Sequence, residues 1–308
     1  MITRSALDIL VDQLFDYSGM FPPESKSFAD AIVDSANFRD KLKRPYMVGV
    51  DIVLTFNEVK NLTEELLINS GYKINSTFKV AVIGSQVVAN ENDFIDESLY
   101  LKGLFSGYQK ILPRVCAYEV KVSNHILSNN NLFDKLISSF SCPIAIEPDL
   151  SDINWSESLA KAIQIVSGNK EKLTLKIRGT GPTAIDTNKI ASVIMHTTKA
   201  KINLKATGGL HHPIIEPARY GNNLGFINLA IALYLSHQYQ EKFSLEDIKE
   251  CLLCDCAPQF EVKDQISFKN FSISLDQLKL LKSRFRFGIG SCSLTEPDSD
   301  LCRLFDNE

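Results

Sequence analysis

Short apolar runs recur along this chain of 308 residues, and the segments between them are long enough to hold helices. Apolar runs of this kind predict buried strands, and the amphipathic patterns between them predict helices. A strict alternation of strand and helix predicts parallel strands joined by crossover helices. The predicted strands begin at Tyr46, Phe78, Arg114, Pro143, Lys172, Lys201 and Arg286, and Tyr17 marks a weaker candidate for the first strand.

Eight such units close into a (β/α)8 TIM barrel, for which about 250 residues are usual. We therefore expect an α/β fold with one TIM-barrel domain over residues 1–308. An open doubly wound sheet is the alternative, but no GxGxxG fingerprint follows the first strand. The segment between strands 7 and 8 contains further helical patterns and a hairpin pattern, so we expect an elaborated crossover there and no second domain.

Composition narrows the classes of partner. The net charge is -4 and no basic stripe is visible, which argues against nucleic acid. No apolar run reaches about 18 residues, so we expect no membrane span, and the N-terminus has the pattern of an amphipathic helix and not of a signal peptide. The seven cysteines lie mostly in apolar patterns, which is typical of a reducing compartment. We expect a cytoplasmic protein whose partner is a small anionic molecule; a homo-oligomer is compatible with the sequence.

Polar side chains alternate with apolar ones along the predicted strands. Successive side chains of a strand point to opposite faces, so one set should enter the barrel lumen. That set is Asp51, Glu119, Lys121, Glu147, Lys176, Arg178, Asn203 and Lys205. Any single pair could be a structural ion pair, but desolvating several ions costs several kcal/mol each. The set as a whole therefore favours an active site at the carboxyl ends of the strands.

Lys176 and Lys205 lie on neighbouring predicted strands, about 5 Å apart. A lysine beside other cations loses its proton more easily, and the neutral amine can form a Schiff base with a carbonyl compound. Glu119 and Glu147 could move protons in such a reaction. The same carboxylates would also stabilise the ammonium form, so the outcome depends on which groups lie closest. If the carboxylates lie closest, Lys176 is expected to be an ion-pair partner or an anion-binding cation and not a nucleophile. The sequence leaves open which lysine is the nucleophile.

The motifs "EVKV", "IEP", "LKIRGTG", "LKATGGL" and "RFGIGSCS" occur in an order that resembles deoxyribose-phosphate aldolase and other class I, Schiff-base aldolase barrels. The resemblance implies that Lys176 is the Schiff-base lysine, that Lys205 lowers its pKa, and that Glu119 replaces an aspartate that shuttles protons. It implies no cofactor. It also implies a phosphate site of backbone donors at Gly208, Gly209, Gly290 and Ser291.

The chain also departs from those aldolases. Arg178 stands where they have a small hydroxyl residue, and "GLHHP" replaces their sequence after the diglycine. These departures predict a different substrate. The pieces "FPP", "KATGGLHHP" and "GSCSLTEP" resemble an uncharacterised bacterial protein group, which implies no activity.

Two histidines and several cysteines add alternatives. We expect His211 and His212 at the substrate site, with one of them packing; together with Glu147 and Asp51 they could instead hold Zn²⁺ or Mn²⁺. The "CLLCDC" stretch has the pattern of a helix face and is expected to be structural. Cys292 could be a nucleophile, but the sequence places no histidine beside it.

Three functions follow from these observations. The first is a lyase of the Schiff-base aldolase type that acts on a small phosphorylated or carboxylated carbonyl metabolite, with Lys176, Lys205, Glu119 and Glu147 as catalytic residues. The second is a metal-dependent lyase or hydrolase, and the third is a non-catalytic binder of an anionic metabolite. The predicted substrate-binding residues are Asp51, Lys121, Arg178, Asn203, Gly208, Gly209, His211, His212, Gly290 and Ser291.

Overall fold

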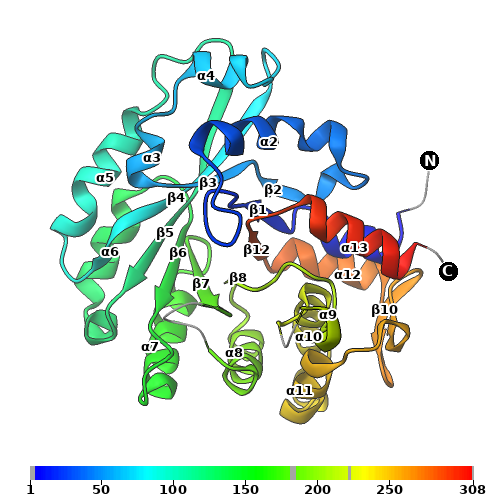
Figure 1. Cartoon of the computed structure of the whole chain (residues 1–308). Coiled ribbons are helices and arrows are strands. Elements are labelled where there is room, and N and C mark those ends of the chain that lie inside the picture. Colours follow the sequence, from blue (N-terminus) through cyan, green and yellow to red (C-terminus); the bar gives the residue numbers. More distant parts are fainter. Residues whose placement is uncertain (1–3, 181–184, 221–222, 307–308) are drawn as a thin grey trace.

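The computed structural model describes residues 4–180, 185–220 and 223–306. It has an α/β fold in which a parallel sheet of nine strands alternates with helices and curls into a nearly closed barrel (Figure 1). The strand order is β2-β1-β12-β8-β7-β6-β5-β4-β3. The predicted alternation of parallel strands with helices is confirmed.

The longest strands of this sheet are β4 and β5, which precede β3 at one end of the strand order. The strands are β1 (Phe15–Tyr17), β2 (Val48–Val50), β3 (Ile52–Thr55), β4 (Thr77–Val88), β5 (Leu112–Val122), β6 (Ile144–Pro148), β7 (Leu173–Arg178), β8 (Leu204–Thr207) and β12 (Phe287–Ser291). The weaker candidate near Tyr17 is therefore a strand.

Asp51 alone separates β2 from β3, which lie at the two ends of the strand order. Its backbone N–H donates to the carbonyl of Lys79, and its carboxylate accepts the N–H of Lys79. The first half of this segment pairs with β1 and the second half with β4. The two ends of the sheet are thus joined through one residue.

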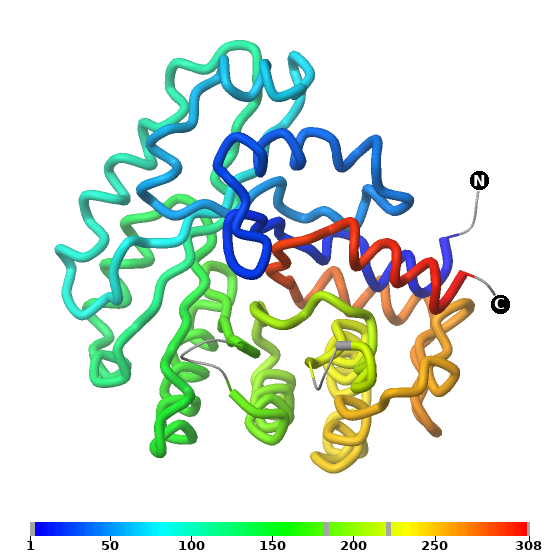
Figure 2. Tube along the Cα trace, in the orientation of Figure 1, coloured from blue at the N-terminus to red at the C-terminus, as the bar shows by residue number. Residues whose placement is uncertain are grey.

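Helices surround the sheet, and the two described ends of the chain lie on the same side of the molecule (Figure 2). The helices outside the segment between β8 and β12 are α1 (Ala6–Val11), α2 (Phe28–Lys41), α3 (Phe56–Val59), α4 (Glu64–Asn69), α5 (Asn92–Gly103), α6 (Asn130–Ser139), α7 (Trp155–Gly168), α8 (Thr187–Ala200) and α13 (Thr295–Phe305). Ser27 caps α2, because its hydroxyl accepts the N–H of Asp30.

The chain between β8 and β12 adds helices and a small antiparallel sheet. These elements are α9 (Pro217–Tyr220), α10 (Phe226–Tyr239), α11 (Leu245–Leu253), β9 (Phe260–Glu261), β10 (Gln265–Phe268), β11 (Phe271–Ser274) and α12 (Leu275–Arg284). The predicted hairpin is formed by β10 and β11, and β9 extends it. Helix α10 packs against α8, α11 and α12, which explains why nearly all of its residues are buried. Over the described ranges, no helix has the length and apolar character needed to cross a membrane.

The "CLLCDC" stretch ends α11, and a buried asparagine of α10 holds it in place. The amide nitrogen of Asn228 donates to the carbonyls of Cys251 and Cys254, at 2.8 Å each. Cys251 is fully buried. These contacts favour the structural role predicted for the stretch.

Replacing Asn228 with alanine should lower the free energy of unfolding by about 2–4 kcal/mol, because two buried carbonyls lose their donor. Urea unfolding would measure the loss. The matched control is Asn37→Ala, which removes one exposed hydrogen bond within α2 and should cost far less. Equal losses in the two variants would show that Asn228 does not anchor the stretch.

Candidate active site

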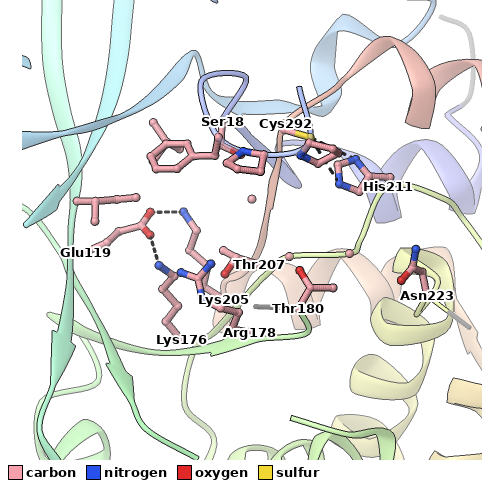
Figure 3. A pocket seen from close by; sticks show the side chains of 18 residues that line it. Ser18, Glu119, Lys176, Arg178, Thr180, Lys205, Thr207, His211, Asn223 and Cys292 are labelled. Atoms are coloured by element: carbon pink, nitrogen blue, oxygen red, sulfur yellow. Dashed lines mark hydrogen bonds and ion pairs between the residues drawn. The ribbon is translucent and has the colours of Figure 1, made fainter. Parts of the chain in front are cut away.

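A pocket of about 400 Å³ opens at the carboxyl ends of the barrel strands (Figure 3). Eight of the residues expected in the site line it: Glu119, Lys176, Arg178, Lys205, Gly208, Gly209, His211 and Gly290. The loop after β1 contributes Ser18, Phe21, Pro22 and Pro23 to the wall, and further lining comes from Val53, Ile83, Thr180, Thr207, Asn223 and Cys292.

Strand register brings the charged groups together. Lys176 of β7 and Lys205 of β8 are direct partners in the parallel pairing. Leu175 and Ile177 are buried on the opposite face, so the alternation of β7 turns the lysine into the lumen.

Glu119 of β5 lies between the two lysines. Its Oε1 accepts a hydrogen bond from Nζ of Lys205 at 2.5 Å, and its Oε2 lies 3.0 Å from Nζ of Lys176. The side chains of Glu119 and Lys176 are 1% and 3% exposed. Burial alone would raise the pKa of Glu119, but the two ammonium groups outweigh it and lower the pKa to about 2. Glu119 is thus a carboxylate at neutral pH, shared by two cations.

Glu147 of β6 holds Lys176 from the other side. One of its oxygens lies 2.8 Å from Nζ of Lys176, and Arg178 donates to both oxygens, at 2.9 and 3.2 Å. Burial would raise the pKa of Glu147, but Lys176 and Arg178 lower it to about 2. Of the two outcomes that the sequence left open, the structure has carboxylates, and not cations, closest to Lys176.

Asp16 of β1 was not predicted as a site residue. Its carboxylate accepts a hydrogen bond from Lys205, opposite Glu119. Burial lowers the pKa of Lys205, but Asp16 and Glu119 outweigh it, so the pKa is raised. Burial raises the pKa of Asp16 more than Lys205 lowers it. The cluster therefore groups three basic side chains (Lys176, Arg178, Lys205) with three acidic ones (Asp16, Glu119, Glu147). The signal was an aspartate between the apolar residues Phe15 and Tyr17, beside the weaker candidate for the first strand.

Because the pKa values of Glu119 and Glu147 are lowered, we expect the free energy of unfolding to decrease at acid pH. A carboxylate with a lowered pKa stabilises the fold above its usual pKa, near 4.5, and this contribution is lost as the pH falls toward 2. We expect the free energy of unfolding to fall by on the order of 3 kcal/mol per carboxylate over that range. Urea unfolding at pH 7, 5 and 3 would measure it. Glu147→Gln should show a smaller fall; an equally steep fall would remove Glu147 as a cause.

Glu147 contacts Lys176 and Arg178 but does not itself line the pocket, and three further expected residues lie outside it. Asp51 is bound to the backbone of Lys79 at the break between β2 and β3. Lys121 is exposed near the end of β5. Asn203 precedes β8, where its side chain binds the carbonyl of Lys170 and the N–H of Arg286. Alternation does not place Asp51 and Asn203, because neither lies within a regular strand. Lys121 has the same alternation as Glu119, but it lies near the end of β5 and is exposed.

Two further expected residues face away from the pocket. Nδ1 of His212 lies 2.8 Å from a carboxylate oxygen of Asp300 in α13. The hydroxyl of Ser291 donates to the carbonyl of Ser293 at 2.6 Å, so only Gly290 of that strand end lines the pocket. Of the two histidines, His211 therefore lines the pocket, while His212 is buried against α13.

The residues of the metal hypothesis do not converge. The rings of His211 and His212 lie 6.4 Å apart and have different partners, and Glu147 is held by Lys176 and Arg178. Among the residues that the structure describes, no three His, Cys, Asp or Glu side chains are grouped so as to hold a metal ion. The metal-dependent reaction thus has no site built from the predicted ligands.

Cys292 lies beside His211, a contact that the sequence analysis missed. The sulfur is 3.6 Å from Nε2 and 3.7 Å from Nδ1 of the ring. The two residues follow the carboxyl ends of β12 and β8, which are neighbours in the sheet. The order of strands in a barrel makes the last strand a neighbour of the strand before the diglycine, and this could have predicted that Cys292 and His211 lie close together.

Glycine is required at positions 208 and 209 by the backbone conformation and by the space available. Gly208 and Gly209 have φ values of 79° and 76°, in the left-handed region that favours glycine. A Cβ at either position would come within 2.6 or 2.7 Å of the side chain of Thr180. The loops after β7 and β8 can therefore approach each other closely at the pocket.

Comparisons with known proteins give no family for this chain. No protein-family model matches it, and no curated protein matches it either. The function is therefore argued from the chemistry of the pocket.

Proposed function

We propose that this protein is a lyase of the Schiff-base aldolase type that acts on a small phosphorylated or carboxylated carbonyl metabolite. The observation that carries the proposal is the carboxylate of Glu119, which bridges two buried lysines inside an open pocket. Perturbed titratable groups gathered in one concave place are the usual sign of chemistry.

The proposed fold is a (β/α)8 barrel. Counting β2 and β3 as one strand broken at Asp51 leaves eight parallel strands, with β8 to β12 as an elaborated crossover. Kinship with class I aldolase barrels is part of the proposal; it is supported by the motif order and by the lysine pair on neighbouring strands.

Lys176 is the proposed nucleophile. Its amine forms a bond to the carbonyl carbon, the carbonyl oxygen leaves as water, and a protonated imine results. This imine carries its positive charge on the same nitrogen as the ammonium, so Glu119 and Glu147 stabilise both. The electrons of the bond between the α and β carbons move toward the imine nitrogen as that bond breaks, which leaves an enamine on Lys176. The β-hydroxyl gives its proton to a base, for which Glu119 is placed, and its fragment departs as a carbonyl compound. The enamine carbon then takes up a proton, and water hydrolyses the imine and frees the lysine.

The attacking amine must first lose a proton. An anionic group of the substrate competes with Glu147 for Arg178, whose side chain is 26% exposed and lines the pocket. With the guanidinium drawn away, Glu147 loses one of the cations that lower its pKa, and it becomes a better base for Lys176. Lys205 keeps Asp16 and Glu119 as partners and stays protonated.

The test is reductive trapping with cyanoborohydride and three probes: pyruvate, dihydroxyacetone phosphate and glyceraldehyde 3-phosphate. The proposal expects a covalent adduct of matching mass with one of them. A probe that binds measurably, and is neither trapped nor cleaved, would instead favour the non-catalytic binder.

Inorganic phosphate should bind between the diglycine loop, Gly290 and Arg178, because these glycines and a guanidinium line the pocket together at the ends of the last two barrel strands. A crystal soaked in phosphate would locate it. Gly208→Ala should weaken binding several-fold, since the new Cβ meets Thr180 at 2.6 Å. Gly288→Ala is the control, because its Cβ has only one neighbour, at 4.0 Å. Phosphate bound elsewhere would contradict the assignment.

A further inference from the structure

We propose that Cys292 and His211 form a second reactive pair in the pocket, in which the sulfur of Cys292 adds to the carbonyl carbon of a bound aldehyde or keto compound while His211 takes the thiol proton. The inference does not rest on the Schiff-base proposal, because the addition uses neither lysine.

The geometry of the pair carries the inference. The sulfur lies 3.6 and 3.7 Å from the two ring nitrogens of His211, so a rotation of the imidazole presents either nitrogen to the thiol. Both residues line the pocket. Figure 3 shows the pair at the opposite end of the pocket from Glu119, Lys176 and Lys205. A small carbonyl compound bound in the pocket would therefore lie between the Cys292–His211 pair and the lysine cluster.

Two further groups support the pair. A carboxylate oxygen of Glu296, in the first turn of α13, lies 3.8 Å from Nδ1 of His211. It can orient the ring and stabilise the imidazolium that forms when the thiol proton arrives. The backbone of Glu24 acts to lower the pKa of the Cys292 thiol, against the effect of burial, and would stabilise a developing thiolate. A nucleophile, a base and a group that orients the base are the usual parts of such a site.

The resting pair is neutral. Burial raises the pKa of the Cys292 thiol, and burial lowers the pKa of the His211 imidazole. Reaction therefore requires the proton to leave the sulfur as the sulfur attacks, which is general-base catalysis and not the chemistry of a preformed thiolate.

The addition balances without any co-reactant. A C–S bond forms, the π electrons of the carbonyl move to its oxygen, and the proton removed by His211 is returned to that oxygen. The product is a hemithioacetal, or a hemithioketal from a keto compound. No atom is oxidised or reduced overall.

The other cysteines supply internal controls. In the described part of the chain, Cys292 alone among the cysteines contacts a histidine. Cys302 is more exposed, and its sulfur instead accepts a hydrogen bond from Arg44 at 3.3 Å. Exposure alone would make Cys302 the more reactive thiol.

Alkylation by iodoacetamide, followed residue by residue by peptide mass mapping, tests the pair. We expect Cys292 to react at least about 10-fold faster than Cys302, and His211→Gln to slow Cys292 about 10-fold or more while Cys302 keeps its rate. Lys176→Met should leave both rates unchanged. In that variant, glyceraldehyde 3-phosphate should protect Cys292 more strongly than inorganic phosphate does.

Two results would overturn the inference: Cys292 reacting no faster than Cys302 in the unmodified protein, or an unchanged rate at Cys292 in His211→Gln. If the histidine variant unfolds, Cys302 accelerates as well, and the comparison within the unmodified protein decides alone. Protection by glyceraldehyde 3-phosphate no greater than by phosphate would refute the carbonyl addition. The alkylation rates and the protection of Cys292 can be measured in Lys176→Met, which cannot form the Schiff base. These measurements therefore test the Cys292–His211 pair even if the lyase proposal is wrong.

Discussion

Lys176→Met is expected to abolish reductive trapping of the probe that the unmodified protein captures, a loss of at least 100-fold. Both described lysines of the pocket are paired with two carboxylates, but only Lys176 has a partner, Glu147, that a substrate bound at Arg178 would change; Lys205 keeps Asp16 and Glu119, which raise its pKa. Methionine keeps the length and apolar stem of lysine, so the pocket wall should persist. Peptide mapping of the unmodified protein should place the adduct on Lys176.

Lys121→Met is the matched control for this experiment. Lys121 lies two residues beyond Glu119 on β5, but it is exposed and lies outside the pocket. Its replacement should leave both the amount and the rate of adduct formation unchanged. An adduct mapped to Lys205 would exchange the roles of the two lysines, and an adduct that persists in Lys176→Met would refute Lys176 as the nucleophile.

The parts of the site that follow from strand alternation could be predicted from the sequence. Within a regular strand the alternation is fixed, so the apolar set of β7 required Lys176 and Arg178 to face the lumen. Neighbouring strands in a barrel then placed Lys205 beside Lys176. The same rule failed at Asp51 and Asn203, where the strand is broken or has not yet begun.

The contacts that depend on loops and on distant register could not be predicted in the same way. Adjacent residues such as His211 and His212 can face any direction once the strand has ended, and the structure turns one toward Cys292 and the other toward Asp300. Asp16 meets Lys205 because β1 and β8 flank the same strand, β12. This relation spans nearly 190 residues of sequence. Sequence alternation therefore predicted the lumen charges but not their partners, and the partners decide how each group titrates.

Glu119→Gln should lower the free energy of unfolding by about 3–5 kcal/mol at pH 7, because it leaves two buried ammonium groups with one carboxylate fewer. Glutamine has the same shape, so the loss reports charge and not volume. Glu97→Gln is the control: Glu97 is also buried, but it accepts hydrogen bonds from the neutral groups of Ser85 and Tyr118, and an amide oxygen can replace it.

The difference in stability between the unmodified protein and Glu119→Gln should depend on pH at both ends of the scale. The pKa of Glu119 is lowered, so its contribution is full above about 4.5 and is lost as the pH falls toward 2. The pKa of Lys205 is raised, so its contribution is full below its usual value of 10.5 and is lost as the pH rises beyond it. Urea unfolding from pH 3 to 11 should therefore give the largest difference between pH 5 and 10. A difference that does not change with pH would mean that packing, and not the shared carboxylate, holds the two lysines in place.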